Sequence, residues 1–342
     1  MLLIECGLTG LHEHIMKNSH LLQHTENYTP PDPLLWEGRS DSLPGERFFQ
    51  HIDWINLQSR MLPDNGQTVF LGFCSDEGVR RNLGRVGAQH GPDDIRKQLA
   101  KLACHTPASF IDVGNIVCHG ERLEAAQDAL SNLVSHIHQT GHKTMAFGGG
   151  HEIAWPHFHG LAKHYPKLGI INFDAHFDIR PPINNQGSSG TPFYQIKSFC
   201  DEHALPFDYC CLGIQSVANT PGLFQRANDW GIQYLTAEQL QYESLAWQTA
   251  FLDEFLMRHQ HLYITICLDM FNESFAPGVS APQALGVNPW RALSLLKYIL
   301  QSGKVISIDF AELSPPLDVK HKTARLAAIL AAELLNETNE GI

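Results

Sequence analysis

Histidine, cysteine and acidic residues that can bind a metal ion or carry a proton follow several apolar segments of this sequence: His151, Asp174, His176, Asp178, Cys267, Asp269 and Glu312. The most specific group is the run Asp-Ala-His-Phe-Asp at 174–178. In an extended segment alternate side chains share one face, so its two carboxylates and its imidazole would point the same way. Such a trio can hold a divalent cation. A solvated turn with unrelated acids is the alternative, and the other groups argue against it.

The number of candidate ligands indicates more than one metal ion. Together with the 174–178 run, the side chains of His151, Cys267 and Asp269 give more donors than one tetrahedral ion needs. Two ions that share a carboxylate, about 3.5–4 Å apart, would use all of them. Such a pair lowers the pKa of bound water and produces hydroxide at neutral pH. This chemistry is typical of a hydrolase.

Eight short apolar runs supply the elements that must position these residues: 68–73, 108–113, 143–147, 168–173, 208–214, 232–235, 262–267 and 304–310. Most are continuously apolar, as strands buried on both faces require, and amphipathic segments typical of helices lie between them. The alternation predicts a three-layer α/β/α fold with a mainly parallel eight-stranded sheet. The candidate ligands follow four of these runs, and open α/β sheets bind ligands beyond the carboxyl ends of their strands.

The region before the first run differs from the rest of the chain. Residues 1–66 contain Thr-Pro-Pro-Asp-Pro and Pro-Asp-Asn-Gly-Gln and show little hydrophobic periodicity. We predict that they form an N-terminal extension that packs on the main domain or is partly disordered. The α/β/α catalytic domain is expected to span 67–337.

Composition argues against several classes of protein. The 342 residues include 24 lysines and arginines against 36 aspartates and glutamates, a net charge of −12 that argues against nucleic-acid binding. No apolar run reaches the roughly 18 residues of a membrane-spanning helix. The first residues lack the pattern of a signal peptide. We therefore expect a cytoplasmic protein whose cysteines are thiols or ligands rather than disulfides, with a small-molecule substrate and no membrane contact.

Four sequence blocks, in order, resemble the arginase/agmatinase ureohydrolase family: GGGHE, DAHFD, the segment from Cys267-Leu-Asp269 to FAPGVSAP, and DFAEL. The resemblance covers about 68–335 and implies an arginase-like fold. The formimidoylglutamase branch is most similar, through DEGVRRNLGRVGAQHGP at 76–92 and SSGTPF at 188–193. It implies hydrolysis of N-formimidoyl-L-glutamate to L-glutamate and formamide, a step of histidine degradation. It also implies two divalent ions, most commonly Mn²⁺, and a trimeric or hexameric homo-oligomer.

The resemblance further implies a role for each residue of the metal-binding blocks. His151 and Asp178 would hold one metal ion. His176 and Asp269 would hold the other. Asp174 would bridge the two ions, and Asp174 or a neighbouring group would move a proton to the leaving nitrogen.

Other residues are expected to bind the substrate. Glu312 matches the family acid that pairs with the amidine-like end, where it would act in binding and catalysis. Arg180 could form a bidentate pair with a glutamyl carboxylate of the substrate. The loop arginines are further candidates: Arg80, Arg81 and Arg85.

Two positions depart from the family pattern. Ser189 stands where arginases carry a proton-shuttling histidine, and we expect it to line the substrate site. Cys267 stands where the family has aspartate, and its thiolate would shift metal preference toward zinc or iron. A buried strand cysteine without metal contact is the alternative. If Cys267 binds metal, oxidation with Cys74 as partner would release the ions.

Structural roles are predicted for other conspicuous residues. His157 and His159 follow GGGHE on an expected helix and are assigned to the surface or to packing. Cys210 and Cys211 lie within an apolar run and are assigned to the core. The three glycines before His151 are no phosphate loop, because they lack the spaced glycines and the lysine of that motif.

Two other functions stay open at this point. The chain could be another ureohydrolase, such as an agmatinase or a guanidino-acid hydrolase, which would release urea rather than formamide. It could also be an arginase-fold binding protein without activity, for which Cys267 is the sole support.

Overall fold

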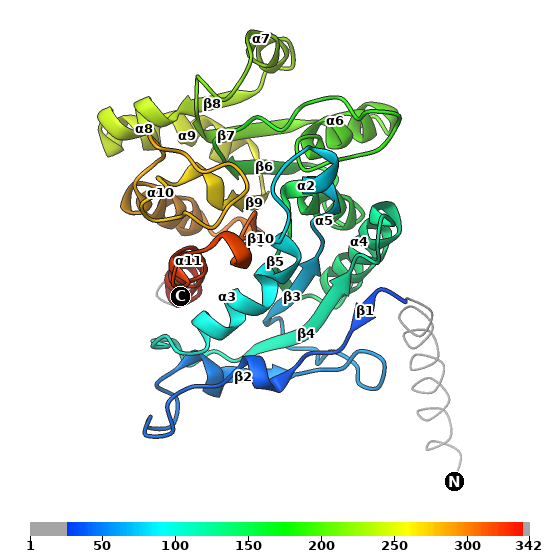
Figure 1. Cartoon of the computed structure of the whole chain (residues 1–342), viewed down its shortest axis with the longest axis vertical. Coiled ribbons are helices and arrows are strands. Elements are labelled where there is room, and N and C mark those ends of the chain that lie inside the picture. The colour runs from blue at the N-terminus through cyan, green and yellow to red at the C-terminus, as the bar shows by residue number, and fades with distance from the viewer. Residues whose placement is uncertain (1–25, 338–342) are drawn as a thin grey trace.

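The computed structural model describes residues 26–337, which are organised around one ten-stranded sheet (Figure 1). The strand order is β1-β4-β3-β5-β10-β9-β6-β7-β8, and β2 pairs with β4 outside this path. The pairings are parallel except that of β1 with β4. The strands are β1 Tyr28–Thr29, β2 Ile52–Trp54, β3 Thr68–Cys74, β4 Phe110–Val117, β5 Lys143–Phe147, β6 Leu168–Phe173, β7 Asp208–Ile214, β8 Gln233–Thr236, β9 His261–Cys267 and β10 Val305–Ala311.

The eight apolar runs form β3 to β10, and the predicted mainly parallel α/β/α fold is confirmed. The predicted number of strands is wrong, because the sheet has ten. Its two additional strands, β1 and β2, are two and three residues long, too short to leave a hydrophobic pattern in the sequence. Both pair with β4, where they cover backbone groups that would otherwise form an open edge.

The part of the predicted extension that the structure describes also contacts the sheet through side chains. The indole of Trp36 donates a hydrogen bond to Oδ2 of Asp112 at 2.7 Å and stacks on Phe70 with ring centroids 5.7 Å apart. Phe48 is fully buried, with its ring centroid 5.7 Å from that of Phe110. Residues 26–66 therefore lie against β3 and β4, while residues 1–25 fall outside the described part of the chain.

Helices cover both faces of the sheet. The α-helices are α2 Glu77–Arg81, α3 Gly91–Leu99, α4 Leu123–Gln139, α5 Ala154–Ala162, α6 Pro192–Glu202, α7 Pro221–Asp229, α8 Ala237–Tyr242, α9 Leu245–Arg258, α10 Pro289–Gln301 and α11 Lys322–Glu337. Short 3-10 helices are η1 Pro33–Leu35, η2 Phe48–His51, η3 Ala88–His90, η4 His151–Ile153, η5 Leu268–Met270 and η6 Pro315–Leu317. None of the helices between residues 26 and 337 is long and apolar enough to cross a membrane.

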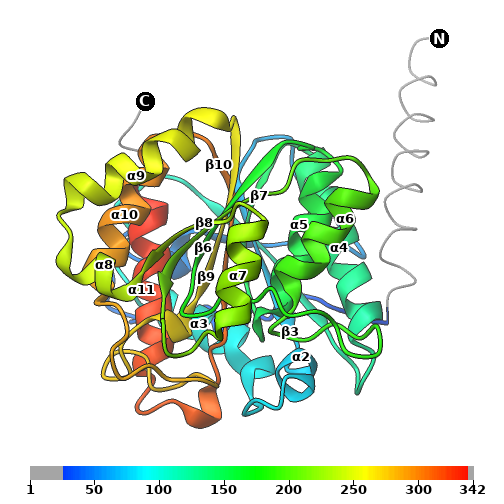
Figure 2. The same ribbon diagram turned by 90° about the horizontal axis from the view of Figure 1, so that it is seen from above.

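Two hydrophobic cores result, one on each face. Helices α3, α8, α9, α10 and α11 contribute to the first core, and α4, α5, α6 and α7 contribute to the second. Figure 2 shows α8 to α11 on one side of the sheet and α4, α5 and α6 on the other. Strand β3 illustrates the division, since Phe70 packs into the first core while Val69, Leu71 and Phe73 pack into the second.

The centre of the sheet determines where the chemical groups meet. Strands β5, β10, β9 and β6 are neighbours and run parallel, so their carboxyl ends lie along one edge. Cys267 is the last residue of β9, and the segments that follow these four strands carry the other candidate ligands and the candidate catalytic acid. Residues separated by up to 161 positions in the sequence are thereby brought into contact, as between His151 and Glu312.

Candidate metal centre

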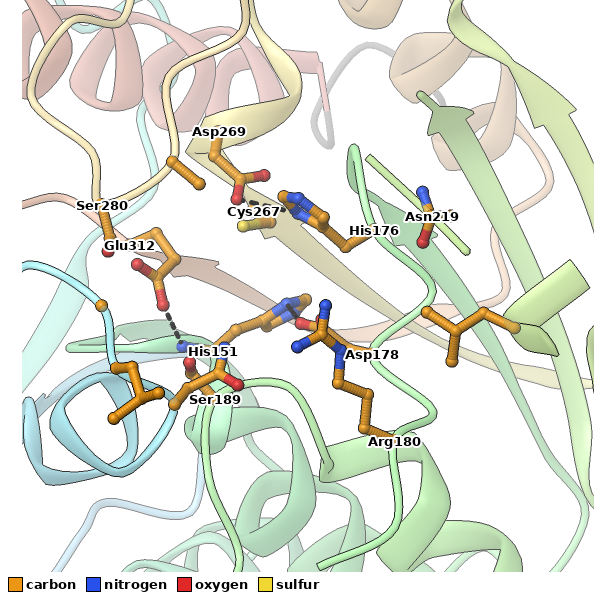
Figure 3. Close-up of a pocket in the computed structure, with 15 residues that line it drawn as sticks. His151, His176, Asp178, Arg180, Ser189, Asn219, Cys267, Asp269, Ser280 and Glu312 are labelled. Carbon is orange, nitrogen blue, oxygen red and sulfur yellow. Dashed lines mark hydrogen bonds and ion pairs between the residues drawn. The ribbon is translucent and has the colours of Figure 1, made fainter. Parts of the chain in front are cut away.

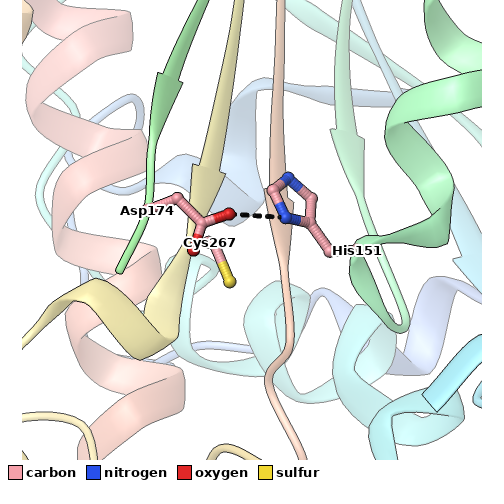
Figure 4. Close-up of side chains that lie close together, drawn as sticks. All are labelled: His151, Asp174 and Cys267. Carbon is pink, nitrogen blue, oxygen red and sulfur yellow. Dashed lines mark ion pairs between the residues drawn. The ribbon is translucent and has the colours of Figure 1, made fainter. Parts of the chain in front are cut away.

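Two small clusters of potential metal ligands share one residue at this edge of the sheet. In the first, one ligand atom each from His151, Asp174 and Cys267 lies within 4.8 Å of the others (Figure 4). His151 Nδ1 is 2.9 Å from Oδ2 of Asp174 and 3.0 Å from Oδ2 of Asp178. The three residues of the first cluster are buried, and Asp178 lies beside them.

The second cluster is formed by Asp174, His176 and Asp269, under the same 4.8 Å limit. His176 Nδ1 is 3.1 Å from Oδ2 of Asp269 and 3.6 Å from Oδ1 of Asp174. Asp174 therefore offers one carboxylate oxygen to each cluster. This is the arrangement that a carboxylate bridging two divalent ions would need.

The donor atoms fit two divalent cations. Oδ1 of Asp269 is buried and has no hydrogen-bond partner among the described residues, which is costly for a carboxylate oxygen unless a cation satisfies it. Imidazole and carboxylate groups suit first-row divalent metals, and the thiol of Cys267 adds one softer donor. Burial, followed by the charges of Asp174 and Asp269, raises the pKa of that thiol well above its usual value. A coordinated metal ion would reverse this, because it deprotonates a ligating thiol outright.

The side chains of this site gather several acids around two imidazoles. Burial would lower the pKa of His151, but the carboxylates of Asp174 and Asp178 hold it well above its usual value. Burial raises the pKa of Glu312 to about 8, and Asp269 adds to the effect. Glu312 is held in place by the backbone N–H of His151, which donates to its Oε1 at 2.9 Å.

A cavity of about 310 Å³ opens above the clusters (Figure 3). Its walls include the candidate residues His151, His176, Asp178, Arg180, Ser189, Cys267, Asp269 and Glu312. Asp174 is fully buried beneath them. Of the described residues that line the cavity, Arg180 is the one lysine or arginine. The cavity thus presents one fixed positive charge among several acids.

Sequence reasoning did not single out several cavity residues: Asn82, Leu83, Gly84, Asn219, Leu223, Ser280 and Ala281. Two signals were available, since Asn82 to Gly84 lie in the 76–92 segment and Ser280 lies in FAPGVSAP. Three non-glycine residues of the cavity wall have left-handed backbone conformations, with φ of 61° at Leu83, 48° at Asp178 and 72° at Glu312. Such conformations cost free energy and concentrate at functional sites.

The loop arginines do not line the cavity. Arg80 and Arg81 form ion pairs with Glu77, at 2.6 and 2.9 Å. Arg85 donates to the carbonyl oxygens of Ser280 and Val279, which ties the 82–85 loop to the adjacent segment 279–280. Their expected role in binding the substrate therefore has no geometric support.

Cys74 ends β3, and two strands, β5 and β10, separate it from the β9 strand of Cys267. Three strand spacings amount to roughly 14 Å, twice the longest Cα separation that a disulfide spans, so the expected pairing is wrong. His157 is fully buried and forms a hydrogen bond with Asp309, so of the two expected roles it has the one in packing. Cys210 and Cys211 lie in the core as predicted.

The chain is similar to known proteins over most of its length. The model of the arginase family matches residues 66–336. Formimidoylglutamase of Legionella pneumophila (strain Paris) is 55% identical over 91% of this chain and 98% of its own length. Formimidoylglutamase of Ralstonia nicotianae is 42% identical over 90% of this chain and 97% of its own length.

Solved structures show the same fold. The formimidoylglutamase of Bacillus subtilis aligns with a TM-score of 0.76 at 20% identity, over 87% of this chain and 95% of the other. The formiminoglutamase of Trypanosoma cruzi with Mn²⁺ aligns with a TM-score of 0.72 at 24% identity, over 82% of this chain and 95% of the other. At these identities the structural likeness supports the arginase-like fold alone.

Proposed function

This chain belongs to the arginase family, and we propose that it hydrolyses N-formimidoyl-L-glutamate to L-glutamate and formamide. The reaction breaks a C–N bond of a linear amidine and would be a step of histidine degradation. Its main support is the 55% identity to a relative named formimidoylglutamase, over nearly the whole length of both chains. The shared carboxylate of Asp174 beneath a cavity with a single arginine is the structural observation that carries the proposal.

We propose that two divalent ions bind the clustered side chains and that they are Mn²⁺, by analogy with the Trypanosoma cruzi formiminoglutamase structure. His151, Asp178 and Cys267 would hold one ion. His176 and Asp269 would hold the second, and Asp174 would contact both. When bound, such ions supply Lewis-acid activation of water at neutral pH.

Glu312 is proposed to receive the formimidoyl end of the substrate. That end is cationic when protonated, and an approaching cation favours the ionised form of a carboxyl whose pKa burial has raised to about 8. The His151 N–H fixes one carboxyl oxygen of Glu312 at 2.9 Å, so the side chain is oriented before substrate arrives. A fixed charge placed next to the reacting carbon would stabilise the transition state electrostatically.

A proton must reach the leaving nitrogen, and Ser189 cannot carry one as a histidine would. Asp174 is poorly placed for this step, because it is fully buried and does not line the cavity. Asp178 lines the cavity with 14% of its side chain exposed, and its Oδ2 lies 3.0 Å from Nδ1 of His151. We therefore propose that the neighbouring Asp178 moves the proton, while Asp174 organises the ions.

Arg180 is proposed to bind a carboxylate of the glutamyl end. It lines the cavity, is solvent-exposed and forms no ion pair with another residue between 26 and 337. A guanidinium group can bind a carboxylate in a bidentate manner. The same charge disfavours agmatine, which carries a second cation in place of carboxylates, so agmatinase activity is the weaker alternative. A guanidino acid carries a carboxylate, and for that alternative the product, urea, is decisive.

Two further proposals concern the cellular compartment and the oligomeric state. The seven cysteines between residues 26 and 337 are free thiols, as expected of a protein from the reducing cytoplasm, where we propose that it acts. By family resemblance we propose that the chain forms a homo-oligomer, either a trimer or a hexamer. Light scattering after size-exclusion chromatography would measure the mass of this assembly.

The test of the proposed function uses full-length protein loaded with Mn²⁺. N-formimidoyl-L-glutamate, agmatine and a guanidino acid are offered separately, and formamide and urea are quantified. Formamide from the first substrate, without urea from the others, is the expected result. Urea would assign the chain to another ureohydrolase activity, and protein that binds metal but releases neither product would be a binding protein.

A further inference from the structure

A buried carboxylate lies beneath the metal centre, on the β10 strand. Asp309 is fully buried and accepts three hydrogen bonds. The donors are the Tyr263 hydroxyl, the Thr265 hydroxyl at 2.5 Å and His157 Nδ1 at 2.6 Å. The strand register explains the convergence, since Asp309 pairs with Thr265 across β10 and β9 while His157 arrives from α5. Asp309 is not among the residues that line the cavity and belongs to neither ligand cluster.

The hydroxyl of Thr265 connects this carboxylate to His151. Its Oγ1 is 2.5 Å from Oδ1 of Asp309 and 3.0 Å from Nε2 of His151. A carboxylate can only accept, so Thr265 must use its single proton to donate to Asp309. The same oxygen can then only accept from His151, which means that Nε2 of His151 carries a proton. In a neutral ring the lone pair must consequently reside on Nδ1, the atom that faces Asp174 and Asp178.

A second set of contacts fixes the other side of Asp309. His157 Nε2 lies 2.6 Å from Ser307 Oγ, and Ser307 Oγ lies 2.5 Å from Thr144 Oγ1. Thr144 Oγ1 is in turn 3.0 Å from His138 Nε2. Burial lowers the pKa of His138 to about 3, so this ring is neutral at pH 7.

These contacts are consistent with one direction of donation. His138 donates to Thr144, Thr144 to Ser307, and Ser307 to Nε2 of His157. His157 then presents its Nδ1 proton to Asp309. Each donor is used once, and both branches end at the same carboxylate. The network therefore keeps Asp309 in an accepting state, which is what the contact with Thr265 requires.

We propose that Asp309, acting through Thr265, is a positioning residue that fixes the tautomer and ring orientation of His151 for metal binding. The inference rests on the two-metal site of the proposed function but does not depend on the identity of the substrate. Partners that hold the second nitrogen of a metal-binding histidine orient the ring and raise its basicity as a ligand. Here the partner is a hydroxyl backed by a buried carboxylate, rather than the carboxylate itself.

The test compares two substitutions at position 265 in full-length protein stripped of metal with a chelator. Thr265→Val has nearly the same shape but no hydroxyl, whereas Thr265→Ser keeps the hydroxyl. Calorimetric titration with Mn²⁺ should show one of the two ions bound roughly 10–100-fold more weakly in Thr265→Val. Thr265→Ser should bind both ions about as tightly as the parent protein.

Tyr263→Phe is the matched control, because it removes a buried hydrogen bond to Oδ2 of Asp309 and leaves in place the Thr265 contacts with Oδ1 of Asp309 and with Nε2 of His151. It should lower the thermal unfolding temperature of the metal-free protein and leave Mn²⁺ affinity unchanged. Asp309→Asn should weaken the same ion as Thr265→Val, because an amide that donates to Thr265 reverses the tautomer of His151. Should this variant fail to fold, the pair at position 265 decides alone.

Two results would overturn the inference: unchanged affinity for both ions in Thr265→Val, or an equal loss of affinity in Tyr263→Phe. The second result would mean that the network stabilises the core and nothing more. A parent protein that binds two Mn²⁺ ions but releases no formamide would refute the proposed substrate while leaving this inference standing.

Discussion

Asp174 lies with one carboxylate oxygen 2.9 Å from Nδ1 of His151 and the other 3.6 Å from Nδ1 of His176. One carboxylate at the carboxyl end of β6 thus connects two clusters that the neighbouring strands complete. Asp174 is fully buried, so its oxygens are available to these partners and to ions between them but not to bulk water. The whole functional account depends on this shared position.

Substitution of Asp174 by Asn should remove metal from both positions. An amide keeps the shape but supplies no charge and only one acceptor oxygen, so neither ion would retain a bridging ligand. We expect elemental analysis to find less than one metal ion per chain. Activity should fall at least ~100-fold, because loss of a residue that only supports a metal ligand already lowers activity by up to about 100-fold. Asp128→Asn, on the exposed face of α4, is the matched control and should retain full metal content. Two bound ions in Asp174→Asn would contradict the bridging role.

Arg180→Ala should impair substrate binding without affecting metal binding. Loss of a hydrogen-bonded charge partner costs about 1.5–3 kcal/mol, which corresponds to a KM roughly 10–100-fold higher. Metal content should stay at the parent level, because Arg180 lies in the cavity wall outside both clusters. Arg81→Ala is a useful comparison, since Arg81 pairs with Glu77 and Glu124 away from the cavity. An unchanged KM in Arg180→Ala would remove this residue from the substrate site.

Cys267→Asp should change which metal the protein prefers. The thiol belongs to the first cluster, and replacing sulfur with a carboxylate oxygen exchanges a soft donor for a hard one. Competition between Zn²⁺ and Mn²⁺, followed by elemental analysis, should therefore shift toward Mn²⁺ relative to the parent. Cys210→Ser is the comparison variant, because Cys210 is buried in the core away from the clusters. Identical metal ratios in Cys267→Asp and the parent would show that the thiol is not a ligand.

The buried His138 should make the folded protein less stable as the pH falls below 6.5. Burial lowers its pKa to about 3 from an ordinary value of 6.5, so between these values the unfolded chain binds a proton that the folded chain does not. The stability associated with neutral His138 is complete above pH 6.5 and is lost as the pH falls toward 3. Thermal unfolding of metal-free protein should therefore fall more steeply between pH 6.5 and 4 in the parent than in His138→Gln. Parallel curves for the two proteins would contradict the assignment.

Sequence patterns predicted those parts of the fold that local chemistry encodes. The apolar runs before His151, Asp174, Cys267 and Glu312 are long enough to specify buried strands, and the parallel arrangement then brings their ends together. Strands β1 and β2 escaped prediction because two or three residues carry no periodicity, and they form only where β4 offers a pairing edge.

The Asp309 network was also missed, although a signal for it was present. Tyr263 and Thr265 alternate on β9, as Ser307 and Asp309 do on β10, and such alternation within apolar runs places polar groups on one face. What the sequence could not supply was the register that sets Thr265 opposite Asp309, or the helix that brings His157 to the same carboxylate. Those contacts are non-local and follow from the assembled sheet.

The measurement that tests the central claim most directly is formamide release as a function of bound Mn²⁺ per chain. Metal-free protein is titrated with Mn²⁺, and formamide and glutamate from N-formimidoyl-L-glutamate are quantified at each step. The account predicts equal amounts of the two products and full activity only when about two ions are bound per chain. Full activity with one ion, or two bound ions without any release of formamide, would contradict it.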